Sequence, residues 1–94
     1  MTTVVIRHKV GDIDTWLKGH EDRVEIFSKF ASGFQTLQDT NDPNSVILVA
    51  EVFDVDAMQA VLSNPDIIQK IAKEKHTVLE PIIVSMPVAV AETV

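Results

Sequence analysis

The sequence predicts an α+β domain in which helices cover one face of a four-stranded antiparallel sheet. Two observations predict this class. Short runs rich in β-branched residues are separated by segments whose apolar residues recur every three or four positions, as they do on one face of a helix. The 94 residues suffice for one two-layer core but not for a second, so we expect residues 1–94 to form a single domain.

The first half of the chain predicts a strand, a helix and a second strand. Residues 3–10, TVVIRHKV, are rich in β-branched side chains and stop at Gly11. Asp12 is a suitable N-cap for a helix, and Gly33 is a natural stop for its C-terminal end. A strand over 34–40 follows. The apolar face of the predicted helix comprises Ile13, Trp16, Leu17, Val24, Phe27 and either Phe30 or Ala31.

The second half predicts a strand, an interrupted helix and a last strand. The turn sequence NDPN leads into a strand over 45–53 and makes a four-residue hairpin loop. Asp54 caps a short helix, which SNPD at 63–66 interrupts, and a further helical segment runs to about His76. The run PIIVSMPVAV at 81–90 is the last strand, and its prolines favour an edge position.

The order strand, helix, strand, strand, helix, strand is typical of a ferredoxin-like split βαβ fold, with all helices on one face. The opposite face is unusually apolar, because it carries Val5, Ile47, Val49, Phe53 and Ile83. Since each large side chain gains about 1.5–3 kcal/mol on burial, we expect a second copy of the chain to cover this face and form a homodimer. The alternative is a solvated face with scattered apolar residues.

Composition excludes several classes of function. The formal charge is −6, so binding to nucleic acid or to anionic membranes is not expected. The longest apolar segment is about half the length of a membrane-spanning helix, and the amino terminus lacks the features of a signal peptide. We therefore expect a cytoplasmic protein. There is no cysteine, which excludes thiolate chemistry and disulfides.

Two motifs carry a resemblance to a known group. HKVGDIDTW near the amino terminus and NPDIIQKI in the second half, together with the element order over residues 3–88, resemble the dimeric α+β barrel superfamily and a small branch related to the antibiotic-biosynthesis monooxygenases. The resemblance implies a barrel built by sheet-to-sheet dimerisation, with ligands between each sheet and its own helices. Haem breakdown is not implied. Haem-degrading relatives typically carry an Asn on the first strand and a Trp near the second helix, whereas this chain has His8 and Trp16.

Three histidines are predicted to converge on one opening between helices and sheet. Strand alternation places His8 on the same face as Val4 and Ile6. His20 follows Trp16 by four positions and so falls on the predicted buried stripe of the helix, and His76 is turned partly inward. Each of them taken alone is more often a hydrogen-bonded core residue than a ligand-binding one, so the prediction depends on their convergence.

The charged residues near this opening leave alternatives. Arg23 either pairs with Glu21 or Glu25 on a solvated helix face or meets the polar end of a ligand. Glu51 falls on the predicted dimer face, where a pairing with a strand lysine or arginine, Lys9 or Arg7, is expected. Three histidines can in principle hold a metal, but they lack short ligand spacing and a carboxylate to orient them, so we expect neither a metal nor a cofactor.

The resulting hypothesis is a small homodimeric protein that binds an elongated apolar molecule, fatty-acid-like or polyketide-like, between sheet and helices. One alternative is an enzyme in which His8 or His20 acts as a base, such as the cofactor-independent monooxygenase that the resemblance implies. Another is a dimeric interaction module without a ligand. The predicted site residues are His8, Trp16, His20, Arg23, Phe27 and His76.

Overall fold

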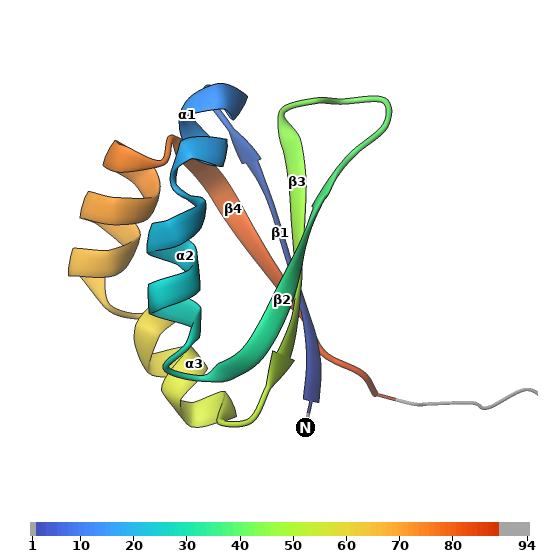
Figure 1. Cartoon of the computed structure of the whole chain (residues 1–94), viewed down its shortest axis with the longest axis vertical. Coiled ribbons are helices and arrows are strands. Elements are labelled where there is room, and N and C mark those ends of the chain that lie inside the picture. Colours follow the sequence, from blue (N-terminus) through green and yellow to red (C-terminus); the bar gives the residue numbers. More distant parts are fainter. Residues whose placement is uncertain (1, 89–94) are drawn as a thin grey trace, which may run out of the picture.

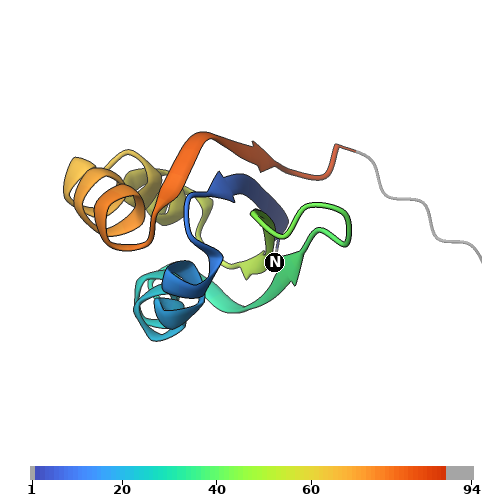
Figure 2. The same cartoon turned by 90° about the horizontal axis from the view of Figure 1, so that it is seen from above.

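The computed structural model describes residues 2–88 of the chain, and Figures 1 and 2 show its two layers. The elements are β1 (Thr2–Val10), α1 (Ile13–Lys18), α2 (His20–Phe27), β2 (Ala31–Gln38), β3 (Ser45–Val52), α3 (Val55–Leu62), the π-helix η1 (Asp66–Lys75) and β4 (Val78–Ser85). The strands form one sheet in the order β2-β3-β1-β4, in which every neighbouring pair is antiparallel. The helices lie together on one side of this sheet (Figure 1). The ferredoxin-like α+β fold predicted from the sequence is therefore confirmed.

The two central strands fix which side chains face the helices. Val5 is paired with Val49 across β1 and β3, so the alternating residues on either side of them turn toward the helix layer. Val4, Ile6, His8 and Val10 are all buried, as strand alternation predicts. Pro81 lies in β4 at an edge of the sheet, as expected, whereas Pro87 lies beyond the end of this strand.

The predicted single helix after β1 is instead two helices that meet at Gly19. The cap at Asp12 is confirmed, since its carboxylate accepts hydrogen bonds from the N–H groups of Asp14 and Thr15. Gly19 lies directly beneath the His76 ring, and a Cβ added there would come within 2.5 Å of Nε2 of His76. A glycine is thus required at this point by close packing, and glycine also weakens a helix interior.

The element boundaries around β2 and β4 also differ from the prediction. The helix ends at Phe27, and β2 begins at Ala31, because the buried Phe30 uses its carbonyl to accept hydrogen bonds from the N–H groups of Phe53 and Asp54. Chain reversal therefore occurs before Gly33, which is a residue of the strand. The last strand runs from Val78 to Ser85, so residues 86–88 of the predicted strand do not belong to it, and residues 89–90 lie outside the described residues.

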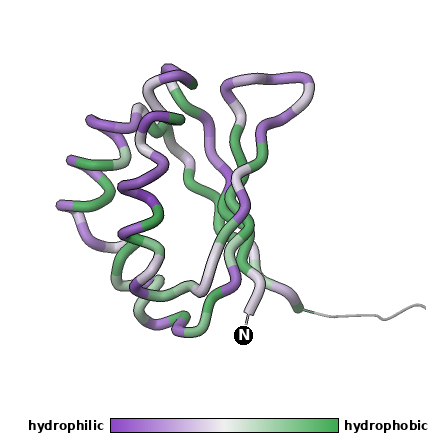
Figure 3. Tube along the Cα trace, viewed as in Figure 1, coloured by the Kyte–Doolittle hydropathy of each residue, from purple (hydrophilic) through white to green (hydrophobic). Residues whose placement is uncertain are grey.

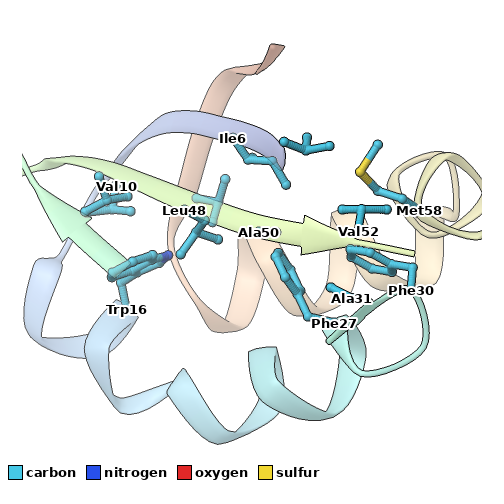
Figure 4. Packing of buried hydrophobic residues seen from close by; sticks show 13 residues of the cluster. Ile6, Val10, Trp16, Phe27, Phe30, Ala31, Leu48, Ala50, Val52 and Met58 are labelled. Atoms are coloured by element: carbon cyan, nitrogen blue, oxygen red, sulfur yellow. The ribbon is translucent and has the colours of Figure 1, made fainter. Parts of the chain in front are cut away.

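The hydrophobic core lies between the sheet and the helices, where Figure 4 shows its side chains, and Figure 3 shows hydrophobic stretches along the strands and hydrophilic ones in the loop between β2 and β3. Its largest fully buried side chains are those of Trp16, Phe30 and Met58, which come from α1, the turn before β2, and α3. The remaining buried apolar members are Val4, Ile6, Val10, Phe27, Ala31, Val46, Leu48, Ala50, Val52 and Val78. At about 1.5–3 kcal/mol for each large side chain, this cluster is the main source of stability.

The π-helix η1 is less buried than the other helices of the layer. None of the ten described residues of η1 is buried, and its apolar side chains Ile67, Ile68 and Ile71 are only half-buried. A π-helix of this length is rare, and π-helical segments are frequent at functional sites. The turn after η1 holds Thr77 in the left-handed region, with a φ of 58°, and Thr77 exchanges hydrogen bonds with Asp12.

The outer face of the sheet is apolar at its centre, as predicted. Val5, Ile47 and Val49 are half-buried on this face, and Leu37, Leu79 and Ile83 are exposed at its edges. The expected pairing of Glu51 is wrong within the chain. Glu51 accepts a hydrogen bond of 2.9 Å from the hydroxyl of Thr3, while Lys9 lies 3.2 Å from a carboxylate oxygen of Asp42. Strand register explains this, because Glu51 is opposite Thr3.

Over residues 2–88, no helix is both long enough and apolar enough to span a membrane.

Candidate functional site

A cavity of about 70 Å³ lies between the sheet and the helix layer. Aliphatic side chains from β1, β3, α3, η1 and β4 line most of it, and Phe27 contributes an aromatic wall. The lining also includes the indole of Trp16 and three residues with cationic or titratable groups, His8, Arg23 and His76. An apolar hollow with a few convergent polar groups is the usual character of a small-molecule site.

Arg23 is the unusual member of this lining. Only 5% of its surface is exposed, because α2 turns it toward the sheet along the stripe that contains Trp16, Gly19 and Phe27. Its guanidinium carbon lies 3.9 Å from the centroid of the Trp16 ring, and one terminal nitrogen donates a hydrogen bond to the Trp16 carbonyl. The expected pairing with Glu21 or Glu25 on a solvated face is therefore wrong.

The remaining nitrogens of Arg23 are unsatisfied. Nε and Nη1 are shut off from solvent and have no hydrogen-bond partner among the described residues. Burial, opposed by the charge of Asp22, lowers the pKa of Arg23 to about 10, so the side chain still carries its charge at neutral pH. Burying a charged group whose N–H donors lack acceptors costs free energy of folding. Buried cations are therefore ordinarily paired with an anion.

His8 lies on the sheet wall of the cavity and packs edge-on against Trp16, with 5.9 Å between the ring centroids. Its Nδ1 lies 3.3 Å from the carbonyl oxygen of Lys9. Because a carbonyl can only accept, this contact requires the proton on Nδ1 and leaves the lone pair of the neutral ring on Nε2. Burial lowers the pKa of His8, opposed by the Lys9 carbonyl, so the neutral ring is favoured at pH 7.

His76 closes the cavity at the end of η1. It is 3% exposed, and its Nε2 lies 3.2 Å from a carboxylate oxygen of Asp22, which also lies 2.6 Å from Nζ of Lys75. The hydrogen bond from Lys75, followed by that from His76, lowers the pKa of Asp22. Burial lowers the pKa of His76, although Asp22 opposes this. The Asp22 carboxylate thus links the C-terminal end of η1 to α2.

His20 does not belong to this group, contrary to the sequence-based prediction. The buried stripe passes through Trp16, Gly19 and Arg23, which leaves His20 exposed on the side of α2. There its ring lies 5.6 Å from that of Phe34, beside a separate surface hollow. The predicted convergence therefore holds for His8 and His76 but not for His20.

The geometry bears on metal binding as well. Within the part of the chain that the structure describes, no three His, Asp or Glu side chains are grouped closely enough to hold a metal ion.

Two contributors to the site were not expected from the sequence. Asp22 was not singled out, because its contact with His76 joins residues 54 positions apart. Gly19 gave only a local signal, a glycine within a helical pattern, and its role appears once the His76 ring is seen to cover it. The isoleucines of η1, Ile67, Ile68 and Ile71, also line the cavity.

Solved structures of antibiotic biosynthesis monooxygenases share this fold. One such monooxygenase superposes with a TM-score of 0.69 at 17% identity, over 97% of this chain and 100% of that one. SnoaB, a cofactor-independent oxygenase from Streptomyces nogalater, gives 0.69 at 17% identity over 97% and 94%. A protein from Pseudomonas aeruginosa, PA3566, gives 0.66 at 11% identity over 96% and 94%. No protein-family model and no curated protein sequence matches the chain. The resemblance inferred from the sequence is thus confirmed as a shared fold.

Proposed function

We propose that the protein binds an apolar small molecule carrying a carboxylate, with the carboxylate at Arg23 and the apolar part between the sheet and η1. The observation that carries this proposal is the Arg23 guanidinium, which is 5% exposed, faces an apolar cavity and has two nitrogens without a partner among the described residues. A carboxylate accepts from two guanidinium nitrogens at once and would compensate the buried charge.

Trp16 supports this assignment by holding the guanidinium in place. The Trp16 ring lies against the guanidinium, and the backbone carbonyl of Trp16 accepts a hydrogen bond from one terminal nitrogen of Arg23. The orientation of the guanidinium is therefore set before a ligand arrives. A pre-oriented arginine loses less side-chain entropy on binding than a free one.

The size of the cavity limits what it holds without rearrangement. At about 70 Å³ it accommodates the head of a ligand, whereas pockets for drug-sized ligands measure about 300–1,000 Å³. The half-buried isoleucines of η1 form the wall that can move outward most easily, because no residue of η1 is buried. A fatty-acid-like or polyketide-like molecule would therefore bind with η1 displaced outward.

The proposal is tested with a pair of ligands that share the phenylpropyl skeleton and differ in the head group, a charged carboxylate in one and a neutral alcohol in the other. Trp16, the single tryptophan of the chain, reports on the site by fluorescence. We expect 3-phenylpropanoate to bind at least tenfold more tightly than 3-phenylpropan-1-ol, and the preference to vanish in Arg23→Met. Equal affinity for both compounds in the unmodified protein would contradict the proposal. His20→Asn is the matched control, because His20 lies outside the cavity.

We further propose that two copies pair through the outer sheet face. The half-buried Val5, Ile47 and Val49 at its centre and the exposed Leu37 and Ile83 around them form an apolar surface that a second copy would cover. This agrees with the barrel that the superfamily resemblance implies. The cavity opens on the other side of the sheet, so pairing would leave it accessible.

The fold shared with SnoaB favours a second candidate, cofactor-independent oxygenation. In such a reaction the deprotonated substrate itself reduces O₂. The test is oxygen uptake with 1-naphthol as an electron-rich probe, compared between the unmodified protein and His8→Asn. Uptake no faster than in buffer would remove this candidate and leave the binding proposal standing.

A further inference from the structure

We infer that the site catalyses keto–enol tautomerisation of aryl-substituted 2-oxo acids, with His8 as the general base. This inference depends on the proposed function, because it requires the carboxylate to be held at Arg23. It adds a reaction and a substrate class to a binding site.

The first step of the argument is the protonation state of His8. Its Nδ1 donates to the Lys9 carbonyl, so the ring is fixed in the tautomer whose Nε2 is a base. Within residues 2–88, no hydrogen-bond partner occupies Nε2, and the ring lines the cavity. A base oriented through its other nitrogen is the arrangement that general base catalysis uses.

The second step is the position of the base relative to the cation. Trp16 contacts both groups, with the His8 ring 5.9 Å from its centroid and the Arg23 guanidinium 3.9 Å from it. Base and cation therefore flank a single aromatic ring at the wall of one cavity. In the proposed complex the carboxylate meets Arg23, and the adjacent carbon atoms lie in the same cavity that His8 lines.

The third step is the class of proton removed. A proton on oxygen exchanges rapidly without help, whereas a proton on carbon leaves slowly unless a base is positioned and the resulting anion is stabilised. In a 2-oxo acid the C3 proton is acidified by the adjacent carbonyl, and the negative charge arrives on the carbonyl oxygen, next to the carboxylate that Arg23 holds. The apolar walls suit an aryl group on C3.

The reaction balances without an oxidant or a cofactor. Nε2 of His8 takes the C3 proton, and the electron pair of that C–H bond becomes the C2–C3 double bond. The carbonyl π electrons move onto the oxygen, where Arg23 stabilises the charge. The His8 imidazolium then returns its proton to the enolate oxygen, which gives the enol and restores the neutral base. The reverse sequence converts enol to ketone.

The experiment uses phenylpyruvate as the probe and measures two quantities on the same samples. Exchange of the C3 protons with D₂O is followed by ¹H NMR, and binding is measured by Trp16 fluorescence. We expect the protein to accelerate exchange at least tenfold over buffer of the same temperature and pH that contains imidazole at three times the protein concentration, which matches the three histidines of the chain. Folded His20→Asn should match the unmodified protein, since His20 lies outside the cavity.

Two variants separate the roles of the residues. His8→Asn should bind phenylpyruvate with affinity within threefold of the unmodified protein but lose the acceleration, and Arg23→Met should lose both. Binding without acceleration, or acceleration that survives in His8→Asn, overturns this inference and leaves the proposed function intact. If the unmodified protein binds neither phenylpyruvate nor 3-phenylpropanoate, this inference and the proposed function are both overturned.

Discussion

Replacement of Arg23 by methionine tests whether this residue serves a ligand or the fold. The fall in the pKa of Arg23 to about 10 on burial corresponds to a penalty of about 3 kcal/mol for keeping the guanidinium charged inside the protein. Two contacts oppose that penalty. The hydrogen bond to the Trp16 carbonyl contributes about 1.5–3 kcal/mol, and the stacking on the Trp16 ring about 0.5–2 kcal/mol.

These opposing terms nearly cancel, so the charged group adds little to the stability of the unliganded protein. Methionine retains most of the apolar stem of arginine and fills an irregular space well. We therefore expect Arg23→Met to change the free energy of unfolding by no more than about 1 kcal/mol in either direction. The loss of a buried core side chain of similar size typically costs about 2–5 kcal/mol.

The assay is urea unfolding, followed by Trp16 fluorescence and by far-ultraviolet circular dichroism, with and without saturating 3-phenylpropanoate. Phe27→Ala, on the same helix face, is the positive control and should lose about 3–5 kcal/mol. The ligand should stabilise the unmodified protein but not Arg23→Met. A loss above about 3 kcal/mol in Arg23→Met without ligand would refute the reasoning and make the arginine a structural residue.

Three further predictions concern packing, assembly and pH. Gly19→Ala should cost about 1–3 kcal/mol in urea unfolding, because a Cβ would lie 2.5 Å from Nε2 of His76, and a Gly11→Ala control should cost less, as its nearest contact is 3.7 Å. If two copies pair through the outer sheet face as proposed, the unmodified protein should have a dimer mass in light scattering and Val49→Lys should be monomeric or unfolded; a dimer mass that Val49→Lys leaves unchanged would contradict pairing through this face. The pKa values of His8 and His76 are lowered, so the folded state binds fewer protons than the unfolded state; the free energy of unfolding should be highest above about pH 6.5 and should fall as the pH drops below it. Urea titrations at pH 7.5 and 5.5 would show this, and equal values for the two would contradict it.

Much of the fold followed from the sequence because its signals are local. The β-branched runs, the Asp12 cap and the hairpin turn each act within a few residues, and strand alternation alone placed His8 inside. Where the prediction failed at a boundary, a distant contact decided the outcome. The carbonyl of Phe30 binds the N–H groups of Phe53 and Asp54 and thereby starts β2 early.

The site was harder to predict because polarity misled the assignment of the helix face. Leu17 and Val24 are apolar, so they drew the predicted stripe toward His20, yet they are 50% and 46% exposed. The true stripe contains Gly19 and Arg23, which a hydrophobicity pattern assigns to solvent. The Trp16 ring and the Trp16 carbonyl help to make a buried arginine tolerable there, and neither contact can be read from residue spacing.

The exposed character of η1 has a practical consequence for finding the ligand. Amide protons in an element without buried residues exchange with solvent through local opening at a small free energy, whereas those of β1 and β3 require nearly global unfolding. A molecule that occupies the cavity contacts η1 through Ile67, Ile68 or Ile71, and these contacts oppose the local opening of η1 even where the helix has moved outward to admit the ligand. Slowed deuterium uptake at residues 66–75, with unchanged uptake in the central strands, would therefore reveal an occupant in a mixture of candidate compounds before its chemical identity is known.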